Sequence, residues 1–205
     1  MPKSTLNVWF KDLPRPNHLC FIDQKAWLME IRKLSAAANR KKRQDKMEKI
    51  SQEARKEIAG WQFLTSAEMK KSILSMLYWA EGQKLPERGS PVKFANTDPR
   101  LVLLFLVLLR DCYRIDESKL RIQIHVHWYH NKRKVRRFWS KLLNVDESLF
   151  NKIYVKQRSK SKRFRKNFAG ICFVIYNSVD LRREIVATGY NIAEKITGKI
   201  PVYLA

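Results

Sequence analysis

The sequence predicts an α+β fold, in which a β-sheet packs on helices and a helical N-terminal extension precedes the domain. Residues 120–127 alternate between apolar and polar side chains, which is the period of a half-buried strand. Elsewhere, apolar residues recur at three- and four-residue spacing, the period of amphipathic helices. With 205 residues, 45% of them hydrophobic, the chain has the size of one compact domain plus an extension, or of two small domains.

Residues 1–16 are expected to contain a short helix, with Ser4 or Thr5 near its start and Pro14 beyond its end. This helix resembles the recognition helix of a helix-turn-helix, whose N-terminal small polar residues face DNA bases. The sequence holds only this part of the motif, without the helices that precede it. The alternative is a helix that packs on the body through Trp9 and Phe10. The residues that would face DNA are Ser4, Thr5 and Asn7.

Residues 17–64 are expected to form a basic helical extension of one or two long helices. An alanine-rich and then basic stretch, residues 36–43, lies in its middle. That stretch would either lie along DNA phosphates or form a solvated face. Two apolar stripes flank it, one of Trp27, Ile31 and Leu34, the other of Met47, Ile50, Ala54, Ile58 and Trp61.

Residues 65–205 are expected to form the α+β domain, and its first helix ends at Gly82. Thr65 and Glu68 make a capping-box pattern at the start of this helix. Gly82 stands just past its end, where a positive φ is common. Glu81 therefore lies in the last turn, either as a solvated carboxylate or as a metal ligand at the tip of a buried helix.

Further strands and helices alternate along the domain. Residues 92–96 alternate as a short strand, and Asp98 then caps a helix with Pro99 at its first position. The run 101–109 in that helix is apolar nearly all round, so we expect it to be heavily buried. The other expected elements are a helix at 132–143 that buries Val135, Phe138, Trp139 and Leu142, strands at 152–157 and 168–176, and a helix at 179–196 that buries Leu181, Ile185, Ile192 and Ile196.

The strand 120–127 has two chemically different faces. Its apolar residues should pack on the helices, and its polar residues suit a nucleic-acid groove. His125 and His127 are two residues apart on the polar face. They would face DNA, bind a metal, or serve plain surface or packing roles. The polar face consists of Arg121, Gln123, His125 and His127.

The charge of the chain favours a polyanionic partner. Forty-two Lys and Arg residues against nineteen Asp and Glu residues give a net charge of +23, whereas solubility needs only about 2 to 8 units. Nucleic acid is the expected partner, and an anionic membrane surface is the alternative. Residues 131–166 contain fourteen of these cations and two acids. The expected phosphate contacts are Lys93 and the basic loop residues Arg158, Lys160, Lys162, Arg163, Arg165 and Lys166.

No segment is expected to cross a membrane. The longest apolar run has nine residues, against ~20 for a spanning helix, and no secretory signal is visible. Cys20, Cys112 and Cys172 are far apart and form no CxxC, so we expect reduced thiols in a cytoplasmic, nucleoid-associated protein. Glycine-rich phosphate loops and the GxSxG and HExxH motifs are absent from the sequence.

Residues 74–82 resemble the nine-residue motif of the LAGLIDADG family of homing endonucleases and their non-nuclease DNA-binding relatives. Leu74, Leu77, Ala80, Glu81 and Gly82 match the motif, Ser75 replaces one small residue by another, and Met76 and Trp79 depart from it. The resemblance extends over residues 66–144. It implies that two such helices pack side by side and that each terminal acid helps to hold a divalent metal near the scissile phosphate. Only one copy is present, so we expect a homodimer and a palindromic or pseudo-palindromic DNA site.

These observations predict a sequence-selective, regulatory protein that binds double-stranded DNA. The alternative is a Mg²⁺-dependent homing-type endonuclease, in which Glu81 of two chains would hold the metal and Gln83 or Lys84 would position water or stabilise developing charge. Without nuclease activity, no cofactor is expected. RNA binding ranks third, because no single strand face carries paired aromatic residues.

Overall fold

The computed structural model describes residues 5, 8–13, 24–83, 89–157 and 169–199. The chain divides into two compact units, residues 1–61 and 62–205. Among the residues that the structure describes, no helix combines the length and the apolar character that a membrane-spanning segment needs. Of the expected N-terminal helix, Thr5, Val8 and Trp9 are helical, while Ser4 and Asn7 lie outside the described residues.

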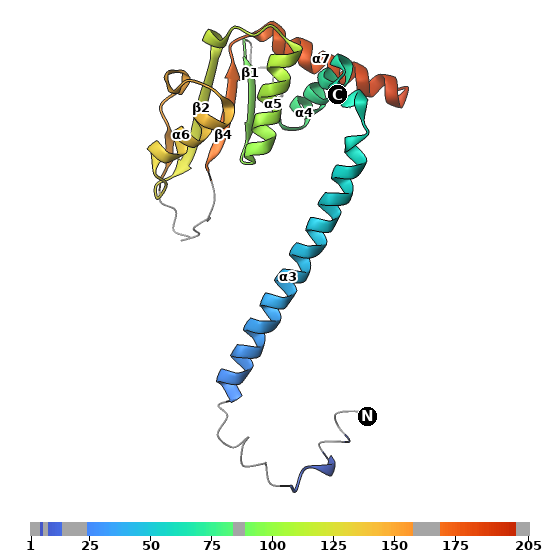
Figure 1. Ribbon diagram of the computed structural model, residues 1–205. Helices are drawn as coiled ribbons and strands as arrows, with labels where there is room; N and C mark the ends of the chain where they lie inside the picture. The colour runs from blue at the N-terminus through green and yellow to red at the C-terminus, as the bar shows by residue number, and fades with distance from the viewer. Residues whose placement is uncertain (1–4, 6–7, 14–23, 84–88, 158–168, 200–205) are drawn as a thin grey trace, which may run out of the picture. The chain divides into compact units, whose positions relative to one another are not determined.

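The first unit contains one long helix, α3 (Gln24–Ala59), of 36 residues (Figure 1). The sequence left open whether one or two helices form here. Alanine and the other good helix formers provide helix propensity across the middle of the segment, so the helix continues without a break. Both apolar stripes are solvent-exposed: Leu34 and Met47 expose 62% and 60% of their surface.

The second unit has the predicted α+β fold. It places helices on one face of a four-stranded sheet (Figure 1). Short 3-10 turns precede α4, β2 and β3, at residues 62–65, 117–119 and 147–149. The elements, in chain order, are α4 (Ala67–Glu81), β1 (Val92–Asn96), α5 (Pro99–Cys112), β2 (Leu120–His127), α6 (Lys132–Leu143), β3 (Tyr154–Lys156), β4 (Ile171–Tyr176) and α7 (Val179–Thr197).

The strands follow the order β1-β4-β2-β3 across the sheet. β4 is antiparallel to both β1 and β2, and β3 is parallel to β2. The strands on either side of the basic loop therefore do not form a hairpin, because β2 lies between β3 and β4. The helix α6 joins β2 to β3 and provides the crossover that parallel neighbours require.

The core lies between the sheet and the helices. Leu120, Ile122 and Ile124 of β2 are completely buried, as their alternation predicts. The ring of Phe94 on β1 stacks on Phe105 of α5, with 4.2 Å between ring centroids and 9° between ring planes. This stack joins the edge strand to the most apolar helix.

Several helix predictions need correction. The cap of α4 is Ser66, whose Oγ accepts a hydrogen bond from Met69 N, because Thr65 belongs to the preceding 3-10 turn. α5 is capped by Asp98 as predicted, but it is buried on only part of its circumference. Four apolar residues expected inside are exposed on the outer sides of their helices: Leu104 and Val107 on α5, Phe138 on α6 and Ile196 on α7.

Candidate nucleic-acid interface

The helices pack on one face of the sheet, and we call the opposite face the open face. Because side chains alternate along a strand, the residues between the buried ones all belong to it. The open face consists of Lys93 and Ala95 on β1, Ile171, Phe173 and Ile175 on β4, Arg121, Gln123, His125 and His127 on β2, and Tyr154 and Lys156 on β3.

The register of the strands arranges these residues in rows. Lys93 and Arg121 both pair with Ile175, so the two cations lie on one row with a single apolar residue between them. Gln123 pairs with Phe173, and His125 lies opposite Ile171 on one side. The structure therefore brings together five of the side chains predicted to contact DNA: Lys93, Arg121, Gln123, His125 and His127.

The two predicted cations are held in different ways. Arg121 donates from Nη1 to the carbonyl oxygens of Ser118 and Leu120, at 2.6 and 2.7 Å. Lys93 extends over the ring of Phe173, with its Nζ 5.3 Å from the ring centroid. This cation–π contact keeps the Lys93 ammonium on the open face.

Two strands add residues that the sequence analysis missed. β4 has apolar side chains on both faces, so Ile171, Phe173 and Ile175 place an apolar stripe in the middle of the open face. Lys156 on β3 pairs with His127 on β2 and adds a cation at the edge of the sheet opposite Lys93. The continuous apolar run of β4 could have indicated that both faces of this strand carry apolar side chains. The place of Lys156 could not have been predicted in that way, because it depends on the pairing of β3 with β2.

His125 lies among aromatic rings. Its ring centroid is 4.8 Å from that of Tyr154 on β3 and 4.4 Å from that of Phe173 on β4. Burial, and to a smaller extent the nearby Lys93 ammonium, lower the pKa of His125 below its usual value, which favours the neutral imidazole. Its Nε2 is buried and has no hydrogen-bond partner among the described residues.

Further rings gather where β2 ends. His127 stacks with Tyr129, with 5.5 Å between centroids and 6° between planes, and Tyr129 lies 4.3 Å from His130. Metal binding by the paired histidines was one of the expectations for this strand. Within the described ranges, no group of three or more His, Cys, Asp or Glu side chains is placed to hold a metal ion.

The end of α4 is tied to the edge of the sheet. The hydroxyl of the buried Tyr78 accepts a hydrogen bond from Lys93 N at 3.3 Å and donates to Gln83 O at 3.4 Å. Gln83 N donates in turn to Lys93 O at 3.0 Å. Glu81 is exposed at this helix end and makes no hydrogen bond or ion pair with the residues that the structure describes. The backbone that follows Glu81 is therefore bonded to β1, the strand that carries Lys93.

Gly82 is required at this junction, but not for the predicted reason. Its φ is −76° and its ψ is 165°, an extended conformation that any residue can adopt. The expectation of a positive φ is wrong. A Cβ at Gly82 would lie 2.5 Å from Tyr78 O and 2.6 Å from the Tyr78 ring. The glycine permits the close return of the chain past Tyr78 toward β1.

The motif residues on α4 also contact α7. Gly189 of α7 is buried, and a Cβ there would lie 3.4 Å from Ser75 O. Trp79 meets Tyr190 edge to face, with 5.3 Å between ring centroids. The small residue Ser75 thus serves a close helix contact within the chain. Pairing of α4 with a second chain remains a prediction.

The remaining predicted site residues cannot be placed. Lys84 and the six cations of the basic loop lie outside the described residues: Arg158, Lys160, Lys162, Arg163, Arg165 and Lys166.

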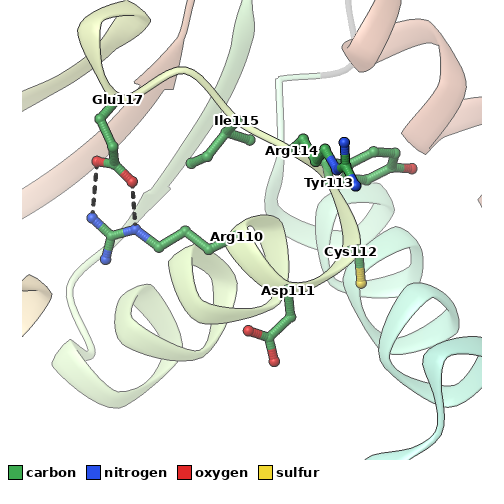
Figure 2. A pocket seen from close by; sticks show the side chains of 7 residues that line it. All are labelled: Arg110, Asp111, Cys112, Tyr113, Arg114, Ile115 and Glu117. Carbon is green, nitrogen blue, oxygen red and sulfur yellow. Dashed lines mark hydrogen bonds and ion pairs between the residues drawn. The ribbon is translucent and has the colours of Figure 1, made fainter.

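A shallow hollow near the end of α5 lies in a different part of the unit (Figure 2). Arg110 forms a two-pronged ion pair with Glu117, at 2.8 and 3.0 Å, and donates to Leu143 O at 2.9 Å. Burial raises the pKa of the Cys112 thiol, with a further rise from Asp111, so the thiolate is disfavoured. The contacts of Arg110 at this hollow therefore connect α5 with the loop before β2 and with the end of α6.

The open face and the adjoining tip of α4 form the candidate interface. The resemblance of residues 74–82 to the LAGLIDADG motif stays a prediction from those residues. Comparison of the chain with protein-family models, with curated proteins and with solved structures found no match.

Proposed function

We propose that this protein binds double-stranded DNA through the open face, selectively for sequence and in a regulatory role. The observation that carries the proposal is the collection of cationic and hydrogen-bonding side chains from three strands on one sheet face, in a chain with a net charge of +23. A basic face of this kind attracts a polyanion and releases its counterions on binding.

The widths of the sheet and of the DNA groove support a particular arrangement. Outer strands of a four-stranded sheet lie about 14 Å apart, and the major groove of B-DNA is about 12 Å wide. The central strands β4 and β2 would then face the bases. Lys93 on β1 and Lys156 on β3 would lie over the two phosphate backbones.

The central strands carry groups that can distinguish bases. An amide such as that of Gln123 can donate to and accept from adenine, and an apolar side chain such as Ile175 can contact the methyl group of thymine. His127 adds a further polar ring at the end of the same strand. These contacts would supply selectivity, and the lysines would supply most of the affinity.

The same surface accommodates the endonuclease alternative. Glu81 is exposed at the end of α4, which is bonded to β1 through Gln83, so the carboxylate would have to reach DNA held on the open face across the edge of the sheet. One carboxylate is not enough to hold Mg²⁺, which requires several oxygen ligands, so a second chain would have to contribute its own Glu81. In that homodimer, two α4 helices would lie together at the centre of a symmetric DNA site.

Two measurements test catalysis and assembly. Incubation of supercoiled plasmid with Mg²⁺ should show cleavage by the unmodified protein and none by Glu81→Gln if the endonuclease alternative holds. Equal cleavage by both proteins would exclude Glu81 as the metal ligand. Analytical ultracentrifugation with palindromic duplex should show two chains per duplex, and monomer alone with and without DNA would contradict the homodimer.

Duplex binding is tested by its salt dependence. Fluorescence anisotropy should show that affinity for a short duplex falls steeply between about 50 and 200 mM salt, because each phosphate contact releases a counterion. Lys93→Gln and Lys156→Gln should each lower the slope of log K against log salt by about one. Lys195→Gln, an exposed lysine on α7, is the matched control and should leave the slope unchanged. Affinity that does not weaken with salt would contradict the proposal.

Association with the nucleoid is a further proposal from the same charge. It predicts that a fluorescent fusion co-localises with DNA in cells and disperses when Lys93 and Lys156 are both replaced by glutamine.

A further inference from the structure

Aromatic rings cross the open face from one edge strand to the centre of the sheet. Tyr154 comes from β3, His125 from β2 and Phe173 from β4. Neighbouring ring centroids are 4.8 and 4.4 Å apart, and both pairs of planes are tilted by 46°. No single strand carries this set, because the sheet assembles it from residues that are up to 48 positions apart in the sequence. These three residues are called the aromatic row.

A fully paired duplex makes little use of such rings. Bases in a duplex stack on one another and expose only their edges in the grooves. A ring face gains most from the flat face of an unpaired base, because every base has such a face. The aromatic row therefore provides a binding mode that double-stranded DNA alone does not use.

We infer that the aromatic row binds an unpaired DNA base, stacked on Tyr154, next to duplex DNA held by the open face. This inference rests on the proposed function and narrows its substrate to DNA with locally unpaired bases, such as a single-stranded gap or an opened base pair.

Tyr154 is the ring best placed for the base. It lies on the edge strand β3 and exposes 56% of its surface. Phe173 has the ammonium group of Lys93 above its ring, 5.3 Å from the centroid. His125 lies between the two other rings and supports Tyr154 from the side. The outer part of the tyrosine ring is thus available, and the other two rings position it.

The surroundings of Tyr154 suit a nucleotide. Lys156 follows two residues later on the same face, about 7 Å along the strand, which is within reach of the phosphate of the stacked nucleotide. Burial, and to a smaller extent Lys93, lower the pKa of His125, so the ring beside Tyr154 adds little charge repulsion toward the nearby lysines. A neutral aromatic support with a cation at its rim is the arrangement that single-stranded nucleic-acid sites share.

The test compares a short DNA duplex with the same duplex carrying an internal single-stranded gap. The gap contains 2-aminopurine, whose fluorescence is quenched when it stacks on an aromatic ring. The unmodified protein should bind the gapped probe at least about fivefold more tightly than the duplex, and should quench the fluorophore. Tyr154→Leu should bind the gapped probe no more tightly than the duplex and should no longer quench the fluorophore.

Two variants control for effects on the fold. Tyr154→Phe keeps the ring and should retain both the preference and the quenching. Tyr190→Leu removes a comparably exposed tyrosine, 42% exposed, from α7 and should bind both probes like the unmodified protein. Thermal denaturation should show that all three variants remain folded.

The outcomes separate this inference from the proposed function. Equal affinity for both probes, or a Tyr154→Leu variant that still prefers and quenches the gapped probe, would overturn the inference and leave duplex binding intact. Failure to bind either DNA probe at low salt would overturn the proposed function and the inference with it. Tight binding of an RNA strand with the sequence of the gap, but not of the gapped DNA, would overturn the assignment to DNA.

Discussion

The two faces of β2 differ in the polarity and the burial of their side chains. Ile122 and Ile124 on one face are fully buried against the helices, and Gln123 and His125 on the other face have partly exposed polar side chains. Adjacent residues of one strand therefore have separate roles, since the buried face holds the domain together and the open face is available to a partner. Substitutions only one position apart should consequently affect different measurements.

The largest expected effect comes from the buried face. Ile124→Ala should lower the free energy of unfolding by about 2–5 kcal/mol, because it removes buried methyl groups and leaves a cavity. Gln123→Ala should change it by less than about 0.5 kcal/mol, because its side chain is on the partly exposed face. Urea denaturation followed by circular dichroism measures both values. Similar losses for the two variants would show that the open face also carries the stability of the fold.

Gly82→Ala tests the border between the helices and the sheet edge. The added methyl group would meet Tyr78 O and the Tyr78 ring at 2.5 and 2.6 Å, and we expect a loss of about 1–3 kcal/mol in unfolding free energy. Tyr78→Phe, which only removes the hydroxyl bonded to β1, should cost about 0.5–1.5 kcal/mol. A stable Gly82→Ala protein would mean that the end of α4 is not packed against β1 as described.

Gln123 should affect binding although it does not affect stability. If its amide contacts one base pair, Gln123→Ala should reduce discrimination at that position by about 1–3 kcal/mol. Selection of binding sites from randomised duplexes, repeated with the variant, identifies the position. An unchanged preference at every position would remove Gln123 from the set of base-reading residues.

The smallest expected effect is the pH dependence of His125. Its pKa in the folded protein is below the unfolded value, mainly because of burial. The unfolded chain therefore takes up this proton more readily, so the contribution of His125 to stability is present above pH of about 6.5 and is lost as the pH falls below it. His125→Phe should flatten this part of the profile of unfolding free energy against pH. An identical slope in the variant would assign the pH dependence to other groups.

Local patterns predicted the individual elements well. The bounds of β1, β2 and α6 match the sequence prediction, since alternation and helical spacing extend without interruption over those segments. The cap of α4 was misplaced by one residue, because both Thr65 and Ser66 can cap a helix and only the preceding 3-10 turn excludes Thr65. The extended conformation of Gly82 was not predicted, because the need for a glycine at this position comes from its contact with Tyr78 and not from its backbone angles.

The candidate site was predicted only in part. The polar residues of β2 follow from one strand, and the structure places them together. Tyr154, Lys156 and Phe173 were missed, because their place on the open face depends on which strands are neighbours. A sequence pattern gives the side of a strand on which a residue lies, but it carries no information about the order of strands in the sheet.

The amino-acid sequence by itself determined the α+β class, the positions of most helices and strands, and the basic character that favours a polyanionic partner. These properties depend on residue types and on spacing within one segment. Only the tertiary structure decided that β2 separates β3 from β4, that three strands assemble the aromatic row, and that α4 ends beside β1. Those features depend on contacts between distant segments, which form when the domain as a whole buries its apolar surface.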